Sequence, residues 1–485
     1  SFELAAGVTI LGGYRGCGSA SPNKRDHVAY PAVLSGDLTG DDSASSCCAI
    51  HDGVGCDESS CEAPVCAERP SCCTDAWTGL CAARAMFLCT GLCDSNGENS
   101  YHVVSSPGVG PTAVLDGFII RAGRADGSPQ FGGGLYNNNG RPTLVSCTFT
   151  GNFSISGGGG VFNNDGAPTF TGCTFAKNIS LGSGGGMGND SAAAPVLDDC
   201  DFIDNWAGGN GGGMSSLNDS TPTLTDCTFT GNTAVGRGGA IHVGENCDVT
   251  LADSLLNGNV ADDGGGIYVR SGGSSALTNC TITGNEGTTI GGGLYTAGMP
   301  VTLTGCVLWG NTSSFSPNDE VAQITAASGV TPAVAYTCIE GWTDLLGGVE
   351  NHGDDPLFVD ADGADDVPGN EDDDLRLAAG SPGINRGDPA RAVAPGDTDL
   401  SGNARVQGCR VDQGAYESSE GQLPGDFDGD DDIDLADFAG FQSCLSAVAA
   451  NPEWSEACLC VFDFNESGDV DLVDYADFAP AMMGP

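Results

Sequence analysis

The same sequence phrase returns every 26 or 27 residues between residues 132 and 311, seven times in all. Each copy contains a run of glycines, followed by a Leu-x-x-Cys-x-Phe-x-x-Asn line or a close variant. One position of the phrase holds a small sulfur or hydroxyl side chain: Cys147, Cys173, Cys200, Cys227, Ser254, Cys280 and Cys306. Another position always holds an amide: Asn152, Asn178, Asn205, Asn232, Asn259, Asn285 and Asn311. A repeat this short and regular predicts that each copy forms one coil of a solenoid.

The residue types within each copy favour strands over helices. Residues 222–224 and 227–230 are short runs of β-branched and aromatic residues that alternate with polar ones. A bend after Leu224 would let Cys227 and Phe229 both point inward. The glycine runs mark another corner, where the backbone needs positive φ or a close approach to its neighbours. We therefore expect an all-β fold, a parallel β-helix with three short strands and three corners per coil.

Stacked coils place identical residues one above another, which predicts a ladder of asparagine amides and an interior column of cysteines. A metal-binding or catalytic row is the alternative, but a site would occur once, whereas these residues recur in every coil. Ser254 fits this view as a small buried filler. Degenerate coils are expected at residues 2–14, 101–122, 321–339 and 355–377. A dozen coils at about 4.8 Å each would make a rod about 55–60 Å long.

The charge balance restricts the partners of this chain. Sixty-five acidic and 16 basic residues give a formal net charge of −49. This charge excludes nucleic acid as a favoured partner, argues against anionic lipid surfaces and favours divalent cations. The sequence contains no apolar run of about 20 residues, so we expect no membrane span. Residues 1–4 already have the pattern of a strand and no initiator Met or signal peptide precedes them, so we expect a processed or truncated chain that begins inside the solenoid.

A cysteine-rich insertion interrupts the coils at residues 43–95. Ten of the 23 cysteines lie between Cys47 and Cys93, which indicates an oxidising compartment and a secreted, extracellular or cell-surface protein. Five disulfide bonds are possible, and the sequence leaves their connectivity open. Zinc binding is the alternative, although paired Cys-x-x-Cys knuckles are missing. Residues 75–89 have a helical pattern, and His51 is expected in an exposed loop.

Two acidic loops follow residue 424. Their candidate ligands are Asp426, Asp428, Asp430, Asp432, Asp434 and Asp437 in the first loop, and Asp463, Asn465, Ser467, Asp469, Asp471 and Asp474 in the second. Calcium takes six to eight hard oxygen ligands, and this alternating spacing wraps a loop of twelve residues around one ion. The sequence therefore predicts two Ca²⁺ sites, followed by helices at 435–448 and 475–482. A solvated acidic tail is the alternative.

Residues 421–485 resemble a type I dockerin, because both loops end in Asp437 and Asp474 where an EF-hand has Glu. The resemblance implies a small α-helical, EF-hand-like domain that binds a cohesin-like protein partner. Two features depart from the family pattern. Asp431 occupies a position where glycine is expected, and the linker between the two units contains cysteines that could staple them by a disulfide: Cys444, Cys458 and Cys460.

The remaining chain resembles the β-helix repeat proteins of planctomycete-type bacteria, which combine such coils with cysteine-rich inserts and dockerin-like tails. The matching lines are Gly12-Gly13-Tyr14, Leu34-Ser35-Gly36-Asp37, the repeats, and the segments 355–358 and 411–416. The repeats are also similar to those of polymorphic outer-membrane adhesins. These resemblances imply a right-handed parallel β-helix over residues 1–42 and 96–420, and a location outside the cell.

The favoured hypothesis is a secreted, calcium-binding structural or adhesion protein without enzymatic activity. Open strand edges at the N-terminus would allow head-to-tail self-association into filaments, and glycans are further candidate partners. The alternative is a polysaccharide-binding or polysaccharide-degrading enzyme, whose best candidate carboxylates share one coil: Asp198, Asp199, Asp201 and Asp204. His242 stands apart from them and is expected on an exposed strand face. The acidic loop at 360–374 could hold calcium or could simply be solvated.

Overall fold

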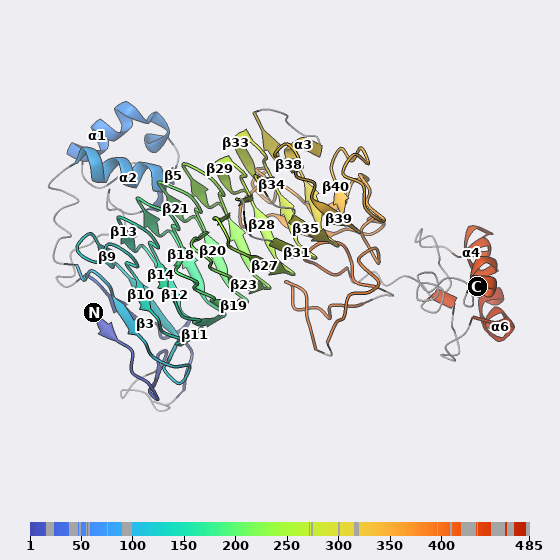
Figure 1. Ribbon diagram of the computed structural model, residues 1–485, viewed down its shortest axis with the longest axis horizontal. Helices are drawn as coiled ribbons and strands as arrows, with labels where there is room; N and C mark the ends of the chain where they lie inside the picture. The colour runs from blue at the N-terminus through green and yellow to red at the C-terminus, as the bar shows by residue number, and fades with distance from the viewer. Residues whose placement is uncertain are drawn as a thin grey trace.

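The fold is known from a computed structural model of the chain. It describes residues 1–15, 24–37, 47, 50–54, 56, 59–74, 76–89, 99–270, 272, 275–298, 301–314, 320–394, 396–407, 410–418, 433, 435–447, 461–462 and 470–481. Every neighbouring pair of strands in the solenoid is parallel, and Figure 1 shows the strands rising coil by coil from the N-terminal end. None of the described helices combines the length and apolar composition that a membrane crossing requires.

Four sheets run along the solenoid, so the prediction of three strands per coil is wrong. Sheet 1 contains β1 (Phe2–Glu3), β6 (Val104–Pro107), β10 (Leu135–Asn138), β14 (Val161–Asn164), β18 (Met187–Asp190), β22 (Met214–Ser216), β26 (Ile241–Val243), β30 (Ile267–Val269), β34 (Leu294–Thr296) and β38 (Ile324–Ala326). Sheet 2 contains β2 (Thr9–Leu11), β7 (Val114–Asp116), β11 (Thr143–Val145), β15 (Thr169–Thr171), β19 (Val196–Asp198), β23 (Thr223–Thr225), β27 (Val249–Ala252), β31 (Ser275–Thr278), β35 (Val301–Thr304) and β39 (Ala333–Ala335).

Sheet 3 contains β3 (Ala32–Ser35), β8 (Phe118–Arg121), β12 (Thr148–Thr150), β16 (Thr174–Ala176), β20 (Asp201–Ile203), β24 (Thr228–Thr230), β28 (Leu255–Asn257), β32 (Thr281–Thr283), β36 (Val307–Trp309) and β40 (Cys338–Ile339). Sheet 4 contains β9 (Arg124–Ala125), β13 (Phe153–Ser154), β17 (Ile179–Ser180), β21 (Trp206–Ala207), β25 (Thr233–Ala234), β29 (Val260–Asp263), β33 (Glu286–Ile290) and β37 (Thr312–Ser313). Sheet 4 was missed because its strands follow the asparagine corner and several contain only two residues.

Coils stack in register, as the repeat predicted. Ten strands in each of the first three sheets give nine intervals, or about 43 Å at the usual strand spacing, which is shorter than the predicted rod. The segments 2–14, 101–122 and 321–339 supply strands, which confirms three of the four degenerate coils. The fourth prediction is wrong, because 355–377 instead forms an antiparallel hairpin of β41 (Phe358–Asp360) and β42 (Asp374–Leu377).

The interior of the solenoid is a set of columns of identical side chains. Phe175, Phe202 and Phe229 are fully buried, and their ring centroids lie 4.5 and 4.4 Å apart along the stack. The cysteine column lies beside these rings, and its described members are buried free thiols. Ser254 is a buried filler as predicted, because its hydroxyl accepts from the Cys227 amide at 3.1 Å and donates to the Ala252 carbonyl at 2.6 Å.

The asparagine column forms the predicted ladder. The Asn178 side-chain amide donates to Asn205 Oδ1 at 3.0 Å, and that of Asn205 donates to Asn232 Oδ1 at 2.9 Å. Each amide also donates to a carbonyl of the preceding coil; Asn205 Nδ2, for example, lies 2.7 Å from Phe175 O. The ladder therefore satisfies buried backbone groups at the corner where the chain passes from sheet 3 to sheet 4.

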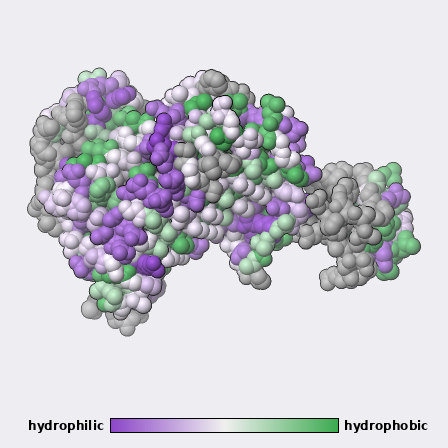
Figure 2. Space-filling view, in the orientation of Figure 1, coloured by the Kyte–Doolittle hydropathy of each residue, from purple (hydrophilic) through white to green (hydrophobic). Residues whose placement is uncertain are grey.

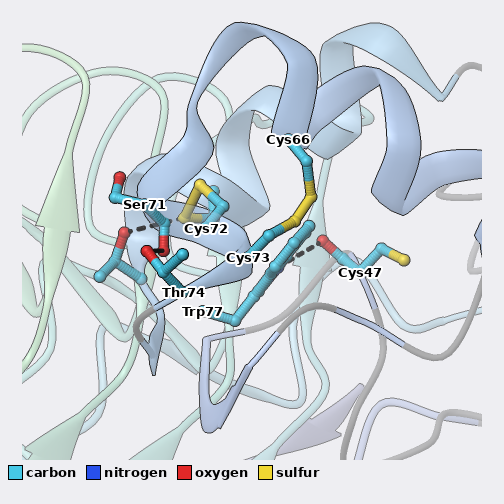
Figure 3. The surroundings of a disulfide bond; sticks show 9 residues. Cys47, Cys66, Ser71, Cys72, Cys73, Thr74 and Trp77 are labelled. Atoms are coloured by element: carbon cyan, nitrogen blue, oxygen red, sulfur yellow. Dashed lines mark hydrogen bonds between the residues drawn. A yellow bond between two sulfur atoms is a disulfide. The ribbon is translucent and has the colours of Figure 1, made fainter.

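The cysteine-rich insertion folds as a small disulfide-bonded unit. It contains β4 (His51–Val54), α1 (Ser59–Glu68), the 3₁₀ turn η1 (Pro70–Cys73), β5 (Ala76–Trp77) and α2 (Gly79–Leu88). Helix α2 was predicted, whereas α1 was not. The described bonds join Cys47 with Cys56, Cys61 with Cys89, Cys66 with Cys73, and Cys72 with Cys81. Figure 3 shows the Cys66–Cys73 bond beside Trp77, whose indole donates to Cys47 O. Disulfide sulfurs are not thiolates, so this pairing favours disulfide bonds over zinc for these eight cysteines.

The insertion packs against sheet 4 rather than standing free. Its buried cysteines, Val65 and Trp77 share a hydrophobic cluster with three residues that stack on successive coils of the solenoid: Phe153, Ile179 and Trp206. Figure 1 shows α1 and α2 beside this part of the solenoid. His51 lies half-buried on β4, with its ring stacked 5.9 Å from that of Trp77, so the expectation of an exposed loop residue is wrong.

The chain after β40 returns along the outside of the coils, and the short helix α3 (Glu320–Gln323) lies just before β38. The returning chain makes backbone and side-chain hydrogen bonds far back in the sequence, such as Gly414 N to Gly305 O at 2.8 Å. Arg405 anchors it: this fully buried guanidinium contacts Asp253 at 2.9 Å and Glu417 at 2.7 Å. The returning segment is therefore part of the solenoid's core packing.

Candidate functional site

Three of the twelve predicted calcium ligands lie among the described residues, namely Asp437, Asp471 and Asp474. The other nine lie outside them: Asp426, Asp428, Asp430, Asp432, Asp434, Asp463, Asn465, Ser467 and Asp469. Asp437 and Asp474 are each fully buried, in the first turn of helices α4 (Leu435–Ala447) and α6 (Leu472–Ala481). The first helix matches its predicted range, and the second begins three residues earlier than predicted.

The two helices form a duplicated unit. Residues 37 positions apart play equivalent roles, because Asp437 corresponds to Asp474 and Phe441 to Phe478. The two phenylalanine rings stack 5.1 Å apart with an interplanar angle of 7° and are fully buried. Cys444 is buried in this core and disulfide-bonded, while the other two cysteines of the predicted staple, Cys458 and Cys460, lie outside the described residues.

The described acids fit calcium ligation. The Asp474 carboxylate accepts the Asp471 amide at 2.8 Å, and the Asp471 carboxylate accepts the Val473 amide at 2.6 Å. These bonds fix both carboxylates at the start of α6. Burial of an anionic oxygen next to an acidic loop is the arrangement in which a divalent cation offsets the desolvation cost.

The four candidate carboxylates of the enzyme hypothesis do not converge on one point. Asp198, Asp199 and Asp201 surround the turn between β19 and β20, whereas Asp204 lies beyond the other end of β20. Burial, followed by nearby negative groups, raises the pKa of Asp198. Burial also raises the pKa of Asp201, against the opposing effect of a 2.6 Å hydrogen bond from the Thr228 hydroxyl.

An acidic column across coils was missed from the sequence. Asp199, Asp226 and Asp253 occupy the same turn in successive coils, with φ values of 53°, 52° and 51°. Burial, followed by repulsion from Asp253, raises the pKa of Asp226 to about 7, and its Oδ1 is buried without a hydrogen-bond partner among the described residues. In the sequence, this column is visible as an aspartate that recurs at the repeat interval of 27 residues. A search for carboxylates within a single coil does not detect it.

His242 is buried rather than exposed, so that prediction is wrong. Its side chain is 2% exposed, its Nδ1 lies 3.2 Å from Ser215 Oγ, and its ring stacks on Tyr268. Burial, followed by the positive charges of Arg237 and Arg270, lowers the pKa of His242 to about 3. Because both members of the Ser215–His242 pair are enclosed, a substrate has no access to them.

A cavity of about 270 Å³, partly open to solvent, lies where the insertion meets the solenoid. The insertion supplies His51, Trp77 and the start of α2, and the solenoid supplies Trp206 and Asp204. Sequence reasoning missed this site because the two halves are separated by more than 120 residues. Trp206 was still visible in the sequence as the largest side chain in its column.

A family model described as "Right handed beta helix region" matches residues 133–318. Among solved structures, the crystal structure of bacteriophage CBA120 tailspike protein 3 matches at 12% identity with a TM-score of 0.25. That match covers 53% of this chain and 48% of the tailspike, so it spans less than half of the tailspike's length. A comparison with curated proteins gives no match. The solenoid is thus a right-handed parallel β-helix, and the family match spans its regular coils.

Proposed function

We propose that this protein is a secreted structural or adhesion protein, in which the β-helix is a rigid spacer and the C-terminal unit is a calcium-dependent docking module. The observation that carries the proposal is the burial of Asp437 and Asp474 at equivalent positions of a duplicated unit. Four disulfide bonds in the insertion support an oxidising, extracellular location.

The β-helix suits a spacer because each coil is fixed to the next by three kinds of contact. Parallel strand pairing, stacked rings and the asparagine ladder all repeat along the axis. Such a structure resists bending, because any displacement of one coil breaks contacts in several columns at once.

Calcium would be held by the candidate oxygen ligands of both loops, Asp437 and Asp474 among them. When bound, the ion supplies the positive charge that lets these anionic side chains remain buried. The stacked pair Phe441 and Phe478 packs the two helices against each other. Calcium binding would therefore order the unit from within its hydrophobic core.

A docking surface is available on this unit. Leu435 and Leu472 occupy equivalent positions at the start of their helices, and each is 74% exposed. Val473 and Tyr475 lie beside Leu472 and are also exposed. Figure 2 shows hydrophobic side chains on the visible face of the unit. An exposed apolar set of this kind is typical of a protein-binding surface, and we assign it to a cohesin-like partner.

Self-association is a second route to assembly. Among the described strands, β1, β2 and β3 at the start of the solenoid each pair on only one side, and Phe2, Val8 and Val33 are exposed beside them. Contact between this end and another part of a second copy would be heterologous and would propagate into a filament.

The test uses immobilised cohesin modules as probes and the full chain as analyte, with calcium or with chelator. We expect capture in calcium, loss of capture in chelator, and loss in Leu435→Asp and Leu472→Asp variants that still bind calcium. Light scattering and electron microscopy of the same samples report filaments. A protein that stays monomeric in calcium and is captured by none of the modules would reject the docking and assembly roles together.

Polysaccharide binding or cleavage remains the second candidate function, favoured by the raised pKa of Asp226 within the acidic column. A carboxyl group that titrates near neutral pH can act as a general acid. Release of reducing sugar or unsaturated product from acidic polysaccharides, abolished by Asp226→Asn, would support cleavage. Absence of any product across the panel would reject it.

A further inference from the structure

The cavity beside the insertion arises from a change in side-chain size between two coils. Sheet 4 stacks Phe153, Ile179 and Trp206 under the insertion, and the next residue in the column is Thr233. At the corner that precedes the strands of sheet 4, the position held by Asp204 in one coil is held by Gly231 in the next coil. A Cβ on Gly231 would lie 2.6 Å from Asp204 Oδ1. The loss of volume at both positions leaves the space that the insertion covers from one side.

The cavity wall carries a hydrogen-bond donor that the chain leaves unused. Trp206 is only 6% exposed, and its indole nitrogen is buried without a hydrogen-bond partner among the described residues. An unsatisfied buried donor is costly unless another group accepts from it. A ligand oxygen in the cavity would remove that cost.

Helix α2 begins at the same cavity. Its N-cap residue Thr78 makes no side-chain capping bond, because its hydroxyl lies 3.2 Å from Cys81 Sγ. The first-turn amides of a helix lack intrahelical acceptors, so this end offers further donors. Asp204 contributes a carboxylate to the same wall, which makes the site rich in both donors and acceptors.

The site is held rigid by the insertion. A Cβ on Gly79 would lie 2.2 Å from Trp206 Cβ, so the start of α2 approaches the solenoid as closely as glycine allows. Disulfide bonds from Cys81 and Cys89 fix both ends of α2. Preorganised walls of this kind lower the ordering cost of binding.

We propose that this cavity binds one neutral sugar residue of a glycan. Trp77 and Trp206 line the cavity and supply apolar surface beside a sugar ring, while the hydroxyl groups of the sugar can accept from the Trp206 indole and donate to Asp204. The volume of about 270 Å³ is slightly below the usual range for pockets that hold drug-sized ligands and suits a single ring. The strongly negative chain and Asp204 both disfavour an anionic ligand.

The test measures binding of methyl glycosides of neutral hexoses to the full chain, by saturation-transfer NMR and titration. Glucuronate and inorganic phosphate are the anionic probes. We expect a neutral glycoside to bind with a Kd on the order of 1 mM. Trp206→Phe keeps the ring but removes the donor, and it should weaken binding about tenfold. Thr233→Leu fills the cavity and should abolish binding.

Trp309→Phe and Asp165→Asn are the matched controls, because both positions lie outside the cavity, and both should bind like the parent. Asp204→Asn should weaken glycoside binding, whereas the control Asp165→Asn should not. Three results would overturn the proposal: no neutral glycoside binds, Thr233→Leu binds as well as the parent, or glucuronate or phosphate binds in preference. The last result would assign the cavity to anions held at the start of α2.

Discussion

Replacing Asn205 by alanine removes one rung of the asparagine ladder. The Asn205 side chain donates to Phe175 O and Asn232 Oδ1, and it accepts from the Asn178 backbone amide at 3.1 Å and side-chain amide at 3.0 Å. Two of these partners keep another bond: Asn178 Nδ2 still donates to Phe149 O, and Asn232 Oδ1 still accepts from the backbone of residue 205.

The Asn178 backbone amide has no other acceptor among the described residues, and Phe175 O loses one of its hydrogen-bond donors. Each buried group left without that bond costs about 1–3 kcal/mol, and the small cavity adds to the cost. We therefore expect Asn205→Ala to lower the free energy of unfolding by about 4 kcal/mol.

The matched control is Asn164→Ala. Asn164 also belongs to a stacked pair, donating to Asn138 Oδ1 at 2.9 Å, but this bond is exposed to solvent. Its loss should change stability by less than about 0.5 kcal/mol. Urea unfolding followed by circular dichroism measures both variants. If Asn205→Ala loses no more stability than Asn164→Ala, the ladder does not contribute as its geometry indicates.

Two further perturbations probe the acidic column and the insertion. The folded-state pKa of Asp226 is raised to about 7, above its ordinary value of 3.8, so the folded protein loses stability as the pH rises between these values. Asp226 has a left-handed φ of 52°, which asparagine also tolerates. Asp226→Asn should therefore raise the thermal midpoint at pH 8 and change it little at pH 4. An equal change at both pH values would contradict this reasoning. Gly79→Ala should push the insertion away from Trp206, seen as a red shift in tryptophan emission and faster proteolysis within residues 59–89, whereas Gly110→Ala, with open space around it, should match the parent. Unchanged emission and proteolysis in Gly79→Ala would show that the contact is not needed for docking.

The sequence predicted the solenoid well because the same residue type returns at the same position of every coil. The positions of Cys227, Phe229 and Asn232 within the phrase set the inward positions, and the register follows from the repeat length. The fourth sheet was not predictable in the same way. A strand of two residues such as β21 (Trp206–Ala207) is too short to show alternation.

The candidate sites show where such reasoning stops. The candidate loop ligands are local in sequence, so spacing alone was enough to propose Asp437 and Asp474, and the structure places both in buried first turns of helices. By contrast, the cavity joins Trp77 with Trp206, and Arg405 reaches Asp253 from a distant segment. His242 was predicted to be exposed because it alternates with inward-facing residues of sheet 1. The glycine-rich corner packs over this outward position, and the alternation of hydropathy does not reveal such a contact.

Native mass spectrometry of the full chain at micromolar free calcium tests the central claim, that the buried acids of the duplicated unit hold calcium. We predict two ions per parent chain, one in each of Asp437→Ala and Asp474→Ala, and none in the double variant. Asp365→Ala, in the exposed acidic loop, should retain both ions. A stoichiometry that is the same in the parent and the double variant would contradict the account.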